Sequence, residues 1–433
     1  MTAEQHKLEK SGENHQELRE WQTKKLDEVA HINLGQSPKG EYYNEEGDGP
    51  HFIQGSKNFG NKYPELERFC SETKREAEEG DVLISVRAPV GPVNIAPENL
   101  CIGRGVTALR LDEGSNEYLY YYLKYFEDKW SQFAGGTTFN SITKSDLQNL
   151  EIPYPPIKER NGIAFILSKI DEKIEVNNRI NADLEEIAQS IFKSWFVDFE
   201  PHLEFKKSEI GEVPAEFEIA EIDDLVWSGR GYSYTSEYLD KGDEIEDSYP
   251  MINLKNVNEG GGFRTDGYKY YTEDQMKDRY KIDEGDLVVA ITDLTQEGRL
   301  IGSPALIPEL DEEMNIISQD VAKIVPEDVP REFLYHLFKT ERFQEYSKSV
   351  ATGTTVLHLS LTSIGEFQFA LPSHEKLEEF AKQVRPIHEK KSNIIQENSR
   401  LRAIRDTILP KLMSGEIRVN DISLDDLEVD SEV

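Results

Sequence analysis

Residues Ala134–Pro156 read AGGTTFNSITKSDLQNLEIPYPP, and residues Ala351–Ser373 read ATGTTVLHLSLTSIGEFQFALPS. The two stretches align without a gap, and the alignment continues to Phe196 in the first copy and to Met413 in the second. This repeat is far longer than the ~20–50 residues of a solenoid unit, so each copy is predicted to be a complete domain with a following segment. Upstream the match is looser but keeps its order, pairing Leu26-Asp27 with Ile222-Asp223 and Glu79–Leu83 with Glu284–Val288.

Length and composition agree with a large folded protein. The chain has 433 residues, of which 37 % are hydrophobic and 10 % aromatic, whereas a disordered chain would be poorer in aromatic residues. It shows no apolar run near the ~18–20 residues of a membrane span and no apolar signal core at its polar start. Its only cysteines, Cys70 and Cys101, lack the paired spacing of a zinc site and cannot form a disulfide framework. We therefore expect a cytoplasmic protein without membrane contact.

Each copy divides into a strand-rich part and a helical part. Gly, Pro, Asn and Asp interrupt short apolar runs in Trp21–Pro156 and Phe217–Ser373, which predicts two mixed domains. Residues 157–199 and 374–414 instead carry apolar residues at alternating spacings of four and three, which predicts two long helices with heptad seams. The first seam is Ile163, Leu167, Ile170, Ile174, Asn177, Asn181, Leu184, Ala188, Ile191 and Trp195. The second is Phe380, Val384, Ile387, Lys391, Ile394, Asn398, Leu401, Arg405, Ile408 and Leu412.

The two seams are predicted to pair with each other. If a pseudo-two-fold axis relates the copies, the helices run antiparallel. Asn177, Asn181 and Asn398 would then specify register at some cost in stability, or they merely hydrate a seam that faces solvent. Lys391 and Arg405 are expected to weaken the second seam, and Pro386 is expected to kink its helix or to mark a late helix start.

The predicted fold class is therefore α+β. Two mixed α/β domains are separated by two long antiparallel coiled-coil helices, with an internal pseudo-two-fold repeat. The predicted boundaries are an N-terminal tail (1–20), a first mixed domain (21–156), a first helical region (157–200), a linker (201–216), a second mixed domain (217–373), a second helical region (374–416) and an acidic C-terminal tail (417–433).

Six motifs carry a family resemblance. They are GQSPKGEYYN at Gly35–Asn44, HFIQGSKNFG at His51–Gly60, GDVLISVRAPVGPVNIA at Gly80–Ala96, IFKSWFVDFEP at Ile191–Pro201, SEIGEVPAEFE at Ser208–Glu218 and ILPKLMSGEIRV at Ile408–Val419. Together they resemble the specificity (S) subunit of type I restriction–modification systems, over nearly the whole chain. The resemblance implies that each mixed domain is a target-recognition domain reading half of a split site in double-stranded DNA. It also implies that the helices space the two halves and dock two methyltransferase subunits, with a restriction subunit as a further partner where one exists.

Net charge argues in the other direction. With 49 Lys and Arg against 83 Asp and Glu, the chain has a formal charge of -34, which disfavours a polyanionic partner unless the acid lies away from the binding face. The acidic runs Glu76–Glu79, Glu244–Asp247 and the C-terminal DDLEVDSE are expected to be solvated faces or tails. A salt-rich cytoplasm would also favour such a surface. On that hypothesis the helical circular dichroism is lost in dilute buffer and restored in molar KCl, whereas indifference to salt would contradict it.

Candidate DNA contacts are Lys, Arg, Asn, Gln, Tyr and Thr residues in glycine-rich loops, which suit phosphates and base edges. In the first domain they are Lys39, Tyr42, Tyr43, Asn44, Gln54, Lys57, Asn58, Arg87, Arg104, Thr137 and Thr138. In the second they are Arg230, Tyr232, Tyr234, Lys255, Asn256, Arg264, Lys269, Thr354 and Thr355. The competing interpretation is that the tyrosines pack inside the domains and that the Gly-Thr-Thr turns are structural.

Candidate docking residues for a methyltransferase subunit are Trp195, Phe196, Arg400, Arg402 and Leu412. For Trp195 and Phe196 the alternative is that they cap the intramolecular coiled coil.

Signals for catalysis are weak. Ile152–Pro156 lacks the leading amide and the order of the Asn/Asp-Pro-Pro-Tyr/Phe loop of amino-methyltransferases, and no G-x-x-x-x-G-K-[ST] phosphate loop or H-E-x-x-H motif occurs. We therefore predict a non-catalytic chain without a metal or cofactor of its own, with S-adenosylmethionine, ATP and Mg on partner subunits. Two alternatives remain open: a fused enzyme with its own methylating or hydrolytic site, and a coiled-coil scaffold with two domains for ligands other than DNA.

Overall fold

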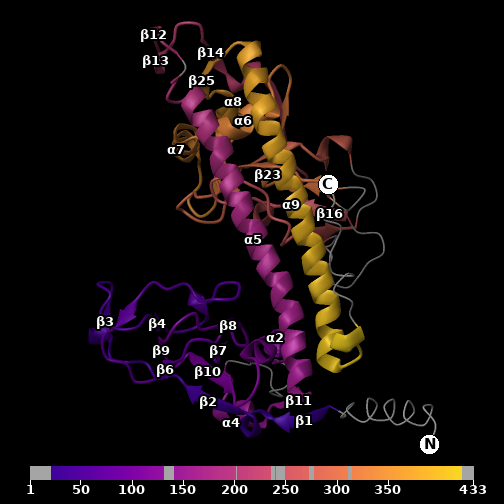
Figure 1. Cartoon of the computed structure of the whole chain (residues 1–433). Coiled ribbons are helices and arrows are strands. Elements are labelled where there is room, and N and C mark those ends of the chain that lie inside the picture. Colours follow the sequence, from indigo (N-terminus) through magenta and orange to yellow (C-terminus); the bar gives the residue numbers. More distant parts are fainter. Residues whose placement is uncertain are drawn as a thin grey trace, which may run out of the picture. The chain divides into compact units, whose positions relative to one another are not determined.

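The computed structural model describes residues 21–130, 141–200, 202–235, 239, 249–272, 277–310 and 315–421. The chain forms two compact units (Figure 1): unit 1 comprises residues 1–173 and 402–433, and unit 2 comprises residues 174–401. Each unit therefore contains one mixed domain together with one part of each long helix. The predicted turn residues Thr137 and Thr138 lie outside the described residues.

Unit 1 is built on a four-stranded antiparallel sheet in the order β2-β10-β7-β8. A three-stranded sheet β4-β9-β6 accompanies it, with β4 parallel to β9, and two further pairs are β1-β11 and β3-β5. The strands are β1 (Gln22–Lys25), β2 (Ala30–Leu34), β3 (Tyr43–Asn44), β4 (Phe52–Ile53), β5 (Phe69–Cys70), β6 (Glu76–Ala77), β7 (Val82–Ser85), β8 (Val93–Ile95), β9 (Leu100–Ile102), β10 (Val106–Leu111) and β11 (Glu151–Tyr154). The shorter helices are α2 (Asn116–Phe126) and α4 (Lys144–Asn149).

The central strands of this sheet are buried on both faces, which explains their nearly uninterrupted apolar sequence. On β7, Val82 and Ile84 belong to the large core that includes α2, whereas Leu83 belongs to the smaller core beneath β4 and β9. On β10, Leu109 faces the large core and Ala108 the smaller one. The alternation follows from the period of two along a strand.

Unit 2 repeats this arrangement. Its main sheet has the order β15-β23-β19-β21, its second sheet places β16 parallel to β22, and β14 pairs with β25 as β1 pairs with β11. The equivalent order of strands confirms the internal repeat. The strands are β14 (Glu218–Glu221), β15 (Val226–Arg230), β16 (Tyr249–Ile252), β17 (Lys269–Tyr271), β18 (Lys281–Ile282), β19 (Leu287–Ala290), β20 (Thr292–Asp293), β21 (Pro304–Leu306), β22 (Asn315–Ile317), β23 (Val321–Pro326), β24 (Leu357–His358) and β25 (Gln368–Leu371). The shorter helices are α6 (Arg331–Phe338), α7 (Glu341–Val350) and α8 (Leu361–Gly365).

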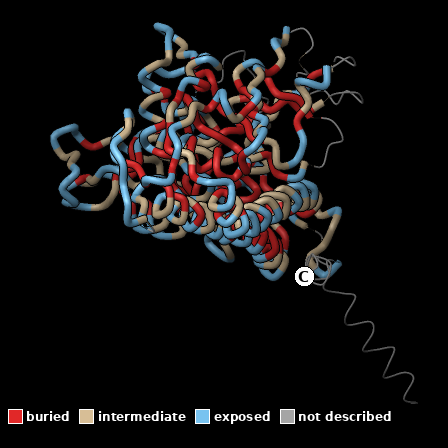
Figure 2. Tube along the Cα trace, turned by 90° about the horizontal axis from the view of Figure 1, so that it is seen from above, coloured by how far each residue is buried: buried red, intermediate tan, exposed pale blue. Residues whose placement is uncertain are grey.

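The long helices are α5 (Ile157–Phe196) and α9 (His374–Ser414). Within unit 2, Asn177 Nδ2 donates to Asn398 Oδ1 at 2.9 Å, and Glu185 pairs with Lys391. Numbers rise along α5 as they fall along α9, so the pairing is antiparallel, as predicted. Buried and exposed positions alternate along the helices, shown in red and pale blue in Figure 2.

The polar seam residues are matched across the helix pair. Lys391, which the sequence suggested would weaken the seam, pairs with the Glu185 carboxylate in unit 2. In unit 1, Arg405 Nη1 pairs with Asp171 Oδ1 at 2.8 Å. Asn177 and Asn398 are buried and bonded to each other, so hydration of a solvent-facing seam is the wrong interpretation for this pair.

Pro386 neither ends α9 nor marks its start. The helix begins at His374, so the late-start alternative is wrong. Both Pro386 and Lys382 are exposed. The carbonyl of Lys382, which loses its partner because proline has no N–H, therefore lies on the outer side of the helix, where water can satisfy it.

Two stretches outside the predicted domains are structured. Within the predicted linker, β12 (Phe205–Ser208) and β13 (Gly211–Pro214) form a hairpin. In the predicted tail, Val419 donates its backbone N–H to Glu159 Oε1 at 3.0 Å and packs against Gly162 of α5. The C-terminal tail therefore does not begin at residue 417 as predicted.

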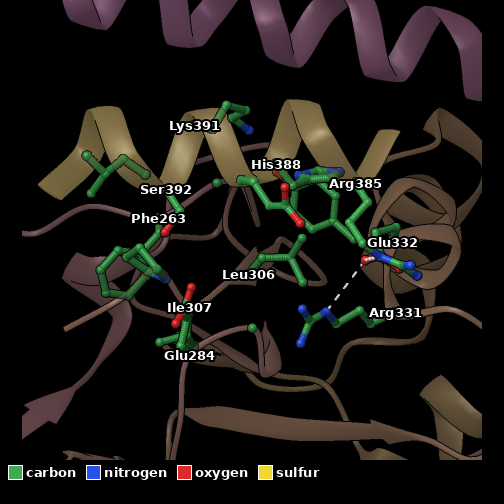
Figure 3. Close-up of a pocket in the computed structure, with 16 residues that line it drawn as sticks. Phe263, Glu284, Leu306, Ile307, Arg331, Glu332, Arg385, His388, Lys391 and Ser392 are labelled. Carbon is green, nitrogen blue, oxygen red and sulfur yellow. Dashed lines mark hydrogen bonds and ion pairs between the residues drawn. The ribbon is translucent and has the colours of Figure 1, made fainter. Parts of the chain in front are cut away.

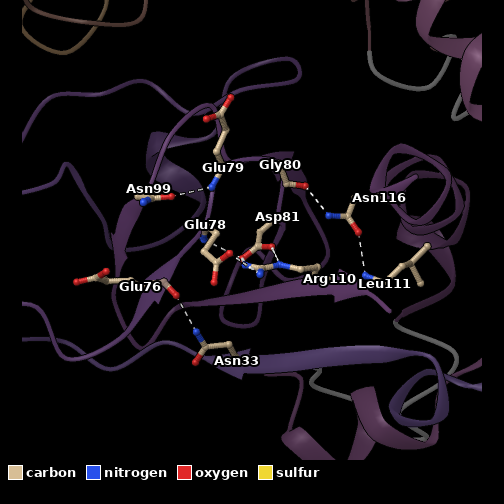
Figure 4. A network of polar contacts seen from close by, with 10 residues as sticks. All are labelled: Asn33, Glu76, Glu78, Glu79, Gly80, Asp81, Asn99, Arg110, Leu111 and Asn116. Atoms are coloured by element: carbon tan, nitrogen blue, oxygen red, sulfur yellow. Dashed lines mark hydrogen bonds and ion pairs between the residues drawn. The ribbon is translucent and has the colours of Figure 1, made fainter. Parts of the chain in front are cut away.

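A polar network braces the sheet of unit 1 (Figure 4). Arg110 on β10 binds Asp81 with two hydrogen bonds, from Nε to Oδ1 at 2.6 Å and from Nη2 to Oδ2 at 3.0 Å. It also pairs with Glu78, and the hydrogen bond to Asp81 is the main reason that the pKa of Arg110 is raised. In unit 2, Asp286 is the equivalent of Asp81 and pairs at 2.5 Å with Lys323, which lies two positions earlier on β23 than the equivalent of Arg110.

Candidate nucleic-acid interface

Four loops of unit 1 meet at one end of its sheets, and we call them edge 1. They are residues 35–39 after β2, 54–58 after β4, 86–92 after β7, and 103–105 between β9 and β10. Backbone hydrogen bonds join them: Gln36 N to Ile102 O at 3.0 Å, Gly103 N to Ile53 O at 2.8 Å, and Val86 N to Gly105 O at 2.9 Å.

Edge 1 gathers five of the predicted DNA-binding residues from segments far apart in sequence. Their side chains are exposed, and they are Lys39, Gln54, Lys57, Arg87 and Arg104. The four loops contain four basic residues and no acidic residue, in a chain whose formal charge is -34. Lys39 forms an exposed ion pair with Glu41 at 3.3 Å, which is worth little in water. Edge 1 is therefore a local positive surface on an acidic protein.

The tyrosine pair of unit 1 serves packing. Tyr43 stacks on Phe52 with ring centroids 4.5 Å apart, and its hydroxyl donates to Pro38 O at 3.1 Å. Tyr42 packs in the same small cluster, and a hydrogen bond with Glu72 raises its pKa. Asn44 closes its own loop, because its amide bonds Asp48 in both directions. Asn58 is half-buried in the turn before β5.

Unit 2 has an equivalent edge, built from the same backbone hydrogen bonds, and we call it edge 2. Tyr232 N donates to Ile317 O at 2.7 Å, Ser318 N to Ile252 O at 2.8 Å, and Ile291 N to Asp320 O at 3.0 Å. These bonds correspond one by one to those of edge 1. The side chains differ, however: Arg104 of edge 1 is replaced by Gln319, and Arg87 by Thr292.

Gln319 is exposed at this edge, and sequence reasoning missed it. The signal was present, because GRGV at Gly103–Val106 aligns with SQDV at Ser318–Val321 once the strands after each turn are matched.

The aromatic candidates of unit 2 form a cluster near edge 2. Tyr232 lies 5.3 Å from both Tyr271 and Tyr280 between ring centroids, and Lys269 donates a hydrogen bond to the Tyr234 hydroxyl. Arg230 and Lys255 are exposed, as are Thr354 and Thr355 in the turn before β24. Arg264 is also exposed and pairs with Asp266 at 2.8 Å, a contact that raises its pKa.

Asn256 corrects the predicted set. It has no exposed surface, and its Nδ2 donates to Arg264 O at 3.1 Å and to Asp266 O at 3.2 Å. Its Oδ1 accepts from Asn253 N at 3.0 Å. Every polar atom of the side chain is used to fix a turn, so Asn256 is inaccessible to DNA.

Comparison with known proteins decides the family. The family model for the type I restriction modification DNA specificity domain matches residues 19–186 and 214–399. The chain belongs to this family. It is a type I specificity subunit with two target-recognition domains, one in each unit.

Curated relatives and a solved structure agree with this assignment. The chain is 28 % identical over 431 residues to the type I restriction enzyme MjaIX specificity subunit of Methanocaldococcus jannaschii, covering 93 % of this chain and 95 % of that protein. It is 38 % identical over 191 residues to a putative MjaX specificity subunit of the same organism, a match that covers 43 % of this chain and 45 % of that one. The S subunit from M. genitalium has the same fold, with a TM-score of 0.55, 22 % identity and coverage of 92 % of this chain and 98 % of that chain.

The predicted docking residues separate into buried and accessible ones. Leu412 has no exposed surface and belongs to the core of unit 1, and Phe196 is 8 % exposed among Phe192, Phe333 and Phe380 of unit 2. These two are core residues rather than docking residues, as the capping alternative stated for Phe196. Trp195 packs half-buried against the same core. Arg400 is exposed, and Arg402 is half-buried with an interaction of its own.

A small pocket lies in unit 2 between loops of the main sheet, α6 and α9 (Figure 3). Glu332 is buried there, and its Oε1 accepts from Arg385 Nε at 3.1 Å and lies 3.7 Å from Arg331 Nε. The cavity volume is about 80 Å³. This cavity is smaller than the about 300–1,000 Å³ of pockets for drug-sized ligands, whereas an adjoining open pocket that shares Arg331, Glu332 and Arg385 has about 370 Å³.

The described residues contain neither a metal-binding cluster nor a membrane-spanning helix. In that part of the chain no three His, Cys, Asp or Glu side chains are grouped so as to hold a metal ion. None of its helices is long and apolar enough to cross a membrane.

Proposed function

We propose that this specificity subunit reads a bipartite, asymmetric site in double-stranded DNA, one half with each target-recognition domain, and does no chemistry itself. The observation that carries the proposal is edge 1, where exposed loops present four basic residues and no acid. Lys and Arg that neutralise phosphates supply most of the sequence-independent affinity for DNA. Edge 1 is the surface where a negatively charged chain can still meet a polyanion.

Asymmetry of the site follows from the two edges. The backbone frame is the same in both units, but edge 1 carries the exposed Arg87 and Arg104 where edge 2 carries the buried Thr292 and the exposed Gln319. Because side chains at base edges determine sequence preference, different side chains on one frame should read different half-sites. Cofactor chemistry, with S-adenosylmethionine, ATP and Mg, is assigned to the partner subunits.

The partner surface is proposed to be an apolar stripe on the outer face of α5. Val176, Ile180 and Ile187 are 44 %, 39 % and 50 % exposed, and their spacings of four and seven place them on one side of the helix. The opposite face of α5 is already buried against α9 and the recognition domain. A methyltransferase subunit is the occupant, since the helices of the family are expected to carry two such partners.

Selection from a random duplex library by the full chain with its methyltransferase tests the DNA proposal. Two unrelated half-motifs separated by a fixed spacer are expected. A palindromic motif would contradict the asymmetry, and the absence of any motif would contradict DNA reading. Methylation of DNA by the purified chain alone, given S-adenosylmethionine, would contradict the non-catalytic role.

Docking can be tested separately from DNA reading. The double variant Ile180→Asp/Ile187→Asp should lose association with the methyltransferase while retaining its helical circular dichroism, because both side chains are exposed. Leu203→Asp is the matched control, since Leu203 is 95 % exposed but lies off the helix. Charge reversal at Arg400 and Arg402 is expected to weaken assembly as well. Unchanged association of the double variant would remove the stripe as the docking surface.

Helix length is proposed to set the spacer between the half-sites. The test inserts one heptad after Lys173 and another after Leu401. Both insertions fall at the boundary between the two units, so the helix contacts described within each unit are kept. Each heptad adds about 10 Å of helix, close to three base pairs at ~3.4 Å per pair. The selected motif should gain about three unspecified base pairs, or binding should be lost. An unchanged spacer would show that the helices do not set it.

A further inference from the structure

The turn between β9 and β10 and its equivalent between β22 and β23 differ in a chemically specific way. The first turn is Gly103-Arg104-Gly105 and the second is Ser318-Gln319-Asp320. Their backbones make equivalent hydrogen bonds to the neighbouring parallel strand, β4 or β16, and to the residue that follows β7 or β19. One exposed side chain stands at the tip of each turn, Arg104 in edge 1 and Gln319 in edge 2.

The backbone of the first turn is held tightly. A Cβ added to Gly103 would lie 3.0 Å from the Phe52 ring, and one added to Gly105 would lie 2.5 Å from Gln54 O. Arg104 N also donates to Ser37 Oγ at 3.2 Å. The backbone at Arg104 is therefore held by two neighbouring segments, β4 with its following loop and the loop after β2, and such support is what precise recognition requires.

The Arg104 guanidinium is left open by its surroundings. Among the residues that the structure describes, it forms no hydrogen bond and no ion pair, although the chain holds 83 acidic residues. The Gln319 side chain likewise has no hydrogen-bond partner in the described part of unit 2, where only its backbone N–H is used, donating to Tyr232 O at 2.8 Å. Both side chains are therefore available to a ligand.

We infer that Arg104 reads a guanine in one half-site and that Gln319 reads an adenine at the equivalent place in the other. The inference rests on the proposed function, which does not say which bases are read, and it names one base in each half-site. The arginine fork matches the N7 and O6 acceptors of guanine in the major groove, and the glutamine amide matches the N7 acceptor and N6 donor of adenine.

Base contact fits the two turns better than phosphate contact. A turn that binds phosphate in both domains would favour positive charge in both, but the second turn has no Lys or Arg and carries the carboxylate of Asp320 beside Gln319. A carboxylate repels phosphate and instead accepts hydrogen bonds from the amino groups of bases, such as N4 of cytosine. The two turns have the same backbone arrangement, but one carries arginine and the other glutamine. Each side chain can form two hydrogen bonds to a base, and the preferred base differs between them.

The experiment is selection from a random duplex library with the full chain and its methyltransferase, comparing wild type with Arg104→Gln and Gln319→Arg. Both residues are exposed, so neither change should unfold the protein. Arg104→Gln is expected to turn one guanine of one half-motif into adenine, and Gln319→Arg to turn one adenine of the other half into guanine. The wrong base at either position should lower affinity about tenfold to a hundredfold. Arg179→Gln, an exposed arginine on α5, is the control and should leave the motif unchanged.

Three outcomes would overturn the inference while leaving the proposed function intact. In the first, the wild-type motif is bipartite but Arg104→Gln leaves every position unchanged. In the second, Arg104→Gln weakens all duplexes alike and reduces the salt slope by about one, which is the signature of a phosphate contact. In the third, the wild-type half-motif affected by Arg104 contains no guanine. If wild type selects no bipartite motif, the proposed function itself fails.

Discussion

The contact between the recognition-domain helix and the long helices occurs once in each unit, with different polar groups. In unit 1, Tyr121 of α2 donates its hydroxyl to Asp171 of α5 at 2.8 Å, and Asp171 also pairs with Arg405 of α9. In unit 2, His336 of α6 faces His388 of α9, with their Nε2 atoms 3.0 Å apart. The gapless alignment of the two copies places Asp171 opposite His388. The position that carries a charged carboxylate in unit 1 therefore carries a histidine in unit 2, where the α6 contact has its charged groups elsewhere, in the ion pairs of Glu185 with Lys339 and Lys391.

The difference determines which joint responds to acid. Burial raises the pKa of Tyr121, and hydrogen bonds to Asp171 and Asp406 raise that of Arg405, so neither group titrates near neutral pH. Burial lowers the pKa of His388 to about 4 and holds that of His336 well below its usual range. His336 Nδ1 faces Gln189 Oε1 at 2.7 Å, so it donates there and its Nε2 accepts from His388. The two units therefore share the packing of these helices, but the polar residues at equivalent positions differ.

The largest expected effect comes from breaking the charged joint. Asp171→Ala leaves the Tyr121 hydroxyl without its acceptor and the Arg405 guanidinium without its main partner, both mostly buried. Removing one partner of a buried ion pair costs about 3 kcal/mol. Urea unfolding combined with hydrogen exchange of the α2 amides should show the loss in unit 1. Glu172→Ala is the control, because its ion pair with Lys169 is exposed and worth under about 1 kcal/mol. Equal effects of the two variants would contradict a buried joint.

The next effect is the acid sensitivity of the histidine pair in unit 2. Both histidines have folded-state pKa values below the usual 6.5, so the unfolded chain binds more protons and acid favours unfolding. The stabilisation is complete above pH 6.5 and is lost as the pH falls toward 4. From His388 alone, unit 2 should lose about 2 kcal/mol between pH 7 and pH 5.

Hydrogen exchange at pH 7 and pH 5, corrected for intrinsic rates, separates the two units. The α6 amides should lose protection at pH 5 while the α2 amides do not. His388→Leu should reduce the loss in unit 2. If wild type and His388→Leu lose the same stability, the histidine pair is not its source.

A smaller effect concerns the asparagine contact of unit 2. Asn398→Ala leaves the Asn177 and Asn178 amides without the partners that they have at 2.9 Å, at a cost of about 1–2 kcal/mol. Asn177→Leu/Asn398→Leu should recover that stability, because two apolar residues satisfy each other, while weakening the register. A double-mutant cycle measures the coupling, with exposed Asn393→Ala as the control. Additive effects would mean that the two asparagines do not act together.

The smallest expected effect concerns the ion pairs of the two main sheets, Arg110 with Asp81 and Lys323 with Asp286. Arg110 donates two hydrogen bonds to Asp81, whereas Lys323 pairs with Asp286 through a single ammonium group. Arg110→Ala should cost about 1 kcal/mol after allowing for solvent exposure, and Lys323→Ala about half of that. Arg110→Lys should lower the stability that this ion pair contributes to unit 1 to about the level contributed by Lys323 in unit 2. Denaturant midpoints at constant m-value provide the comparison, and the reverse order would contradict it.

Much of this fold was predictable because it depends on periodicity. The repeat, the two seams and their antiparallel pairing follow from residues spaced by three and four, and the Asn177–Asn398 contact follows from the same register. The site was predictable only in part. Lys39, Gln54, Arg87 and Arg104 were predicted and do meet at edge 1, but sequence reasoning gave no weight to Gln319 and too much to Asn256.

The sequence by itself determined the duplication, the alternation of mixed domains with long helices, and the family, because gapless repeats, heptads and motifs are local patterns. Only the tertiary structure decided which side chains are buried and which are exposed to a ligand. Phe196 and Leu412 are apolar residues near the ends of the two long helices, and they are core residues because other segments of their units cover them. Four loops of unit 1 form one basic edge only because strands far apart in sequence end side by side. Burial and convergence depend on long-range packing, which no local pattern contains.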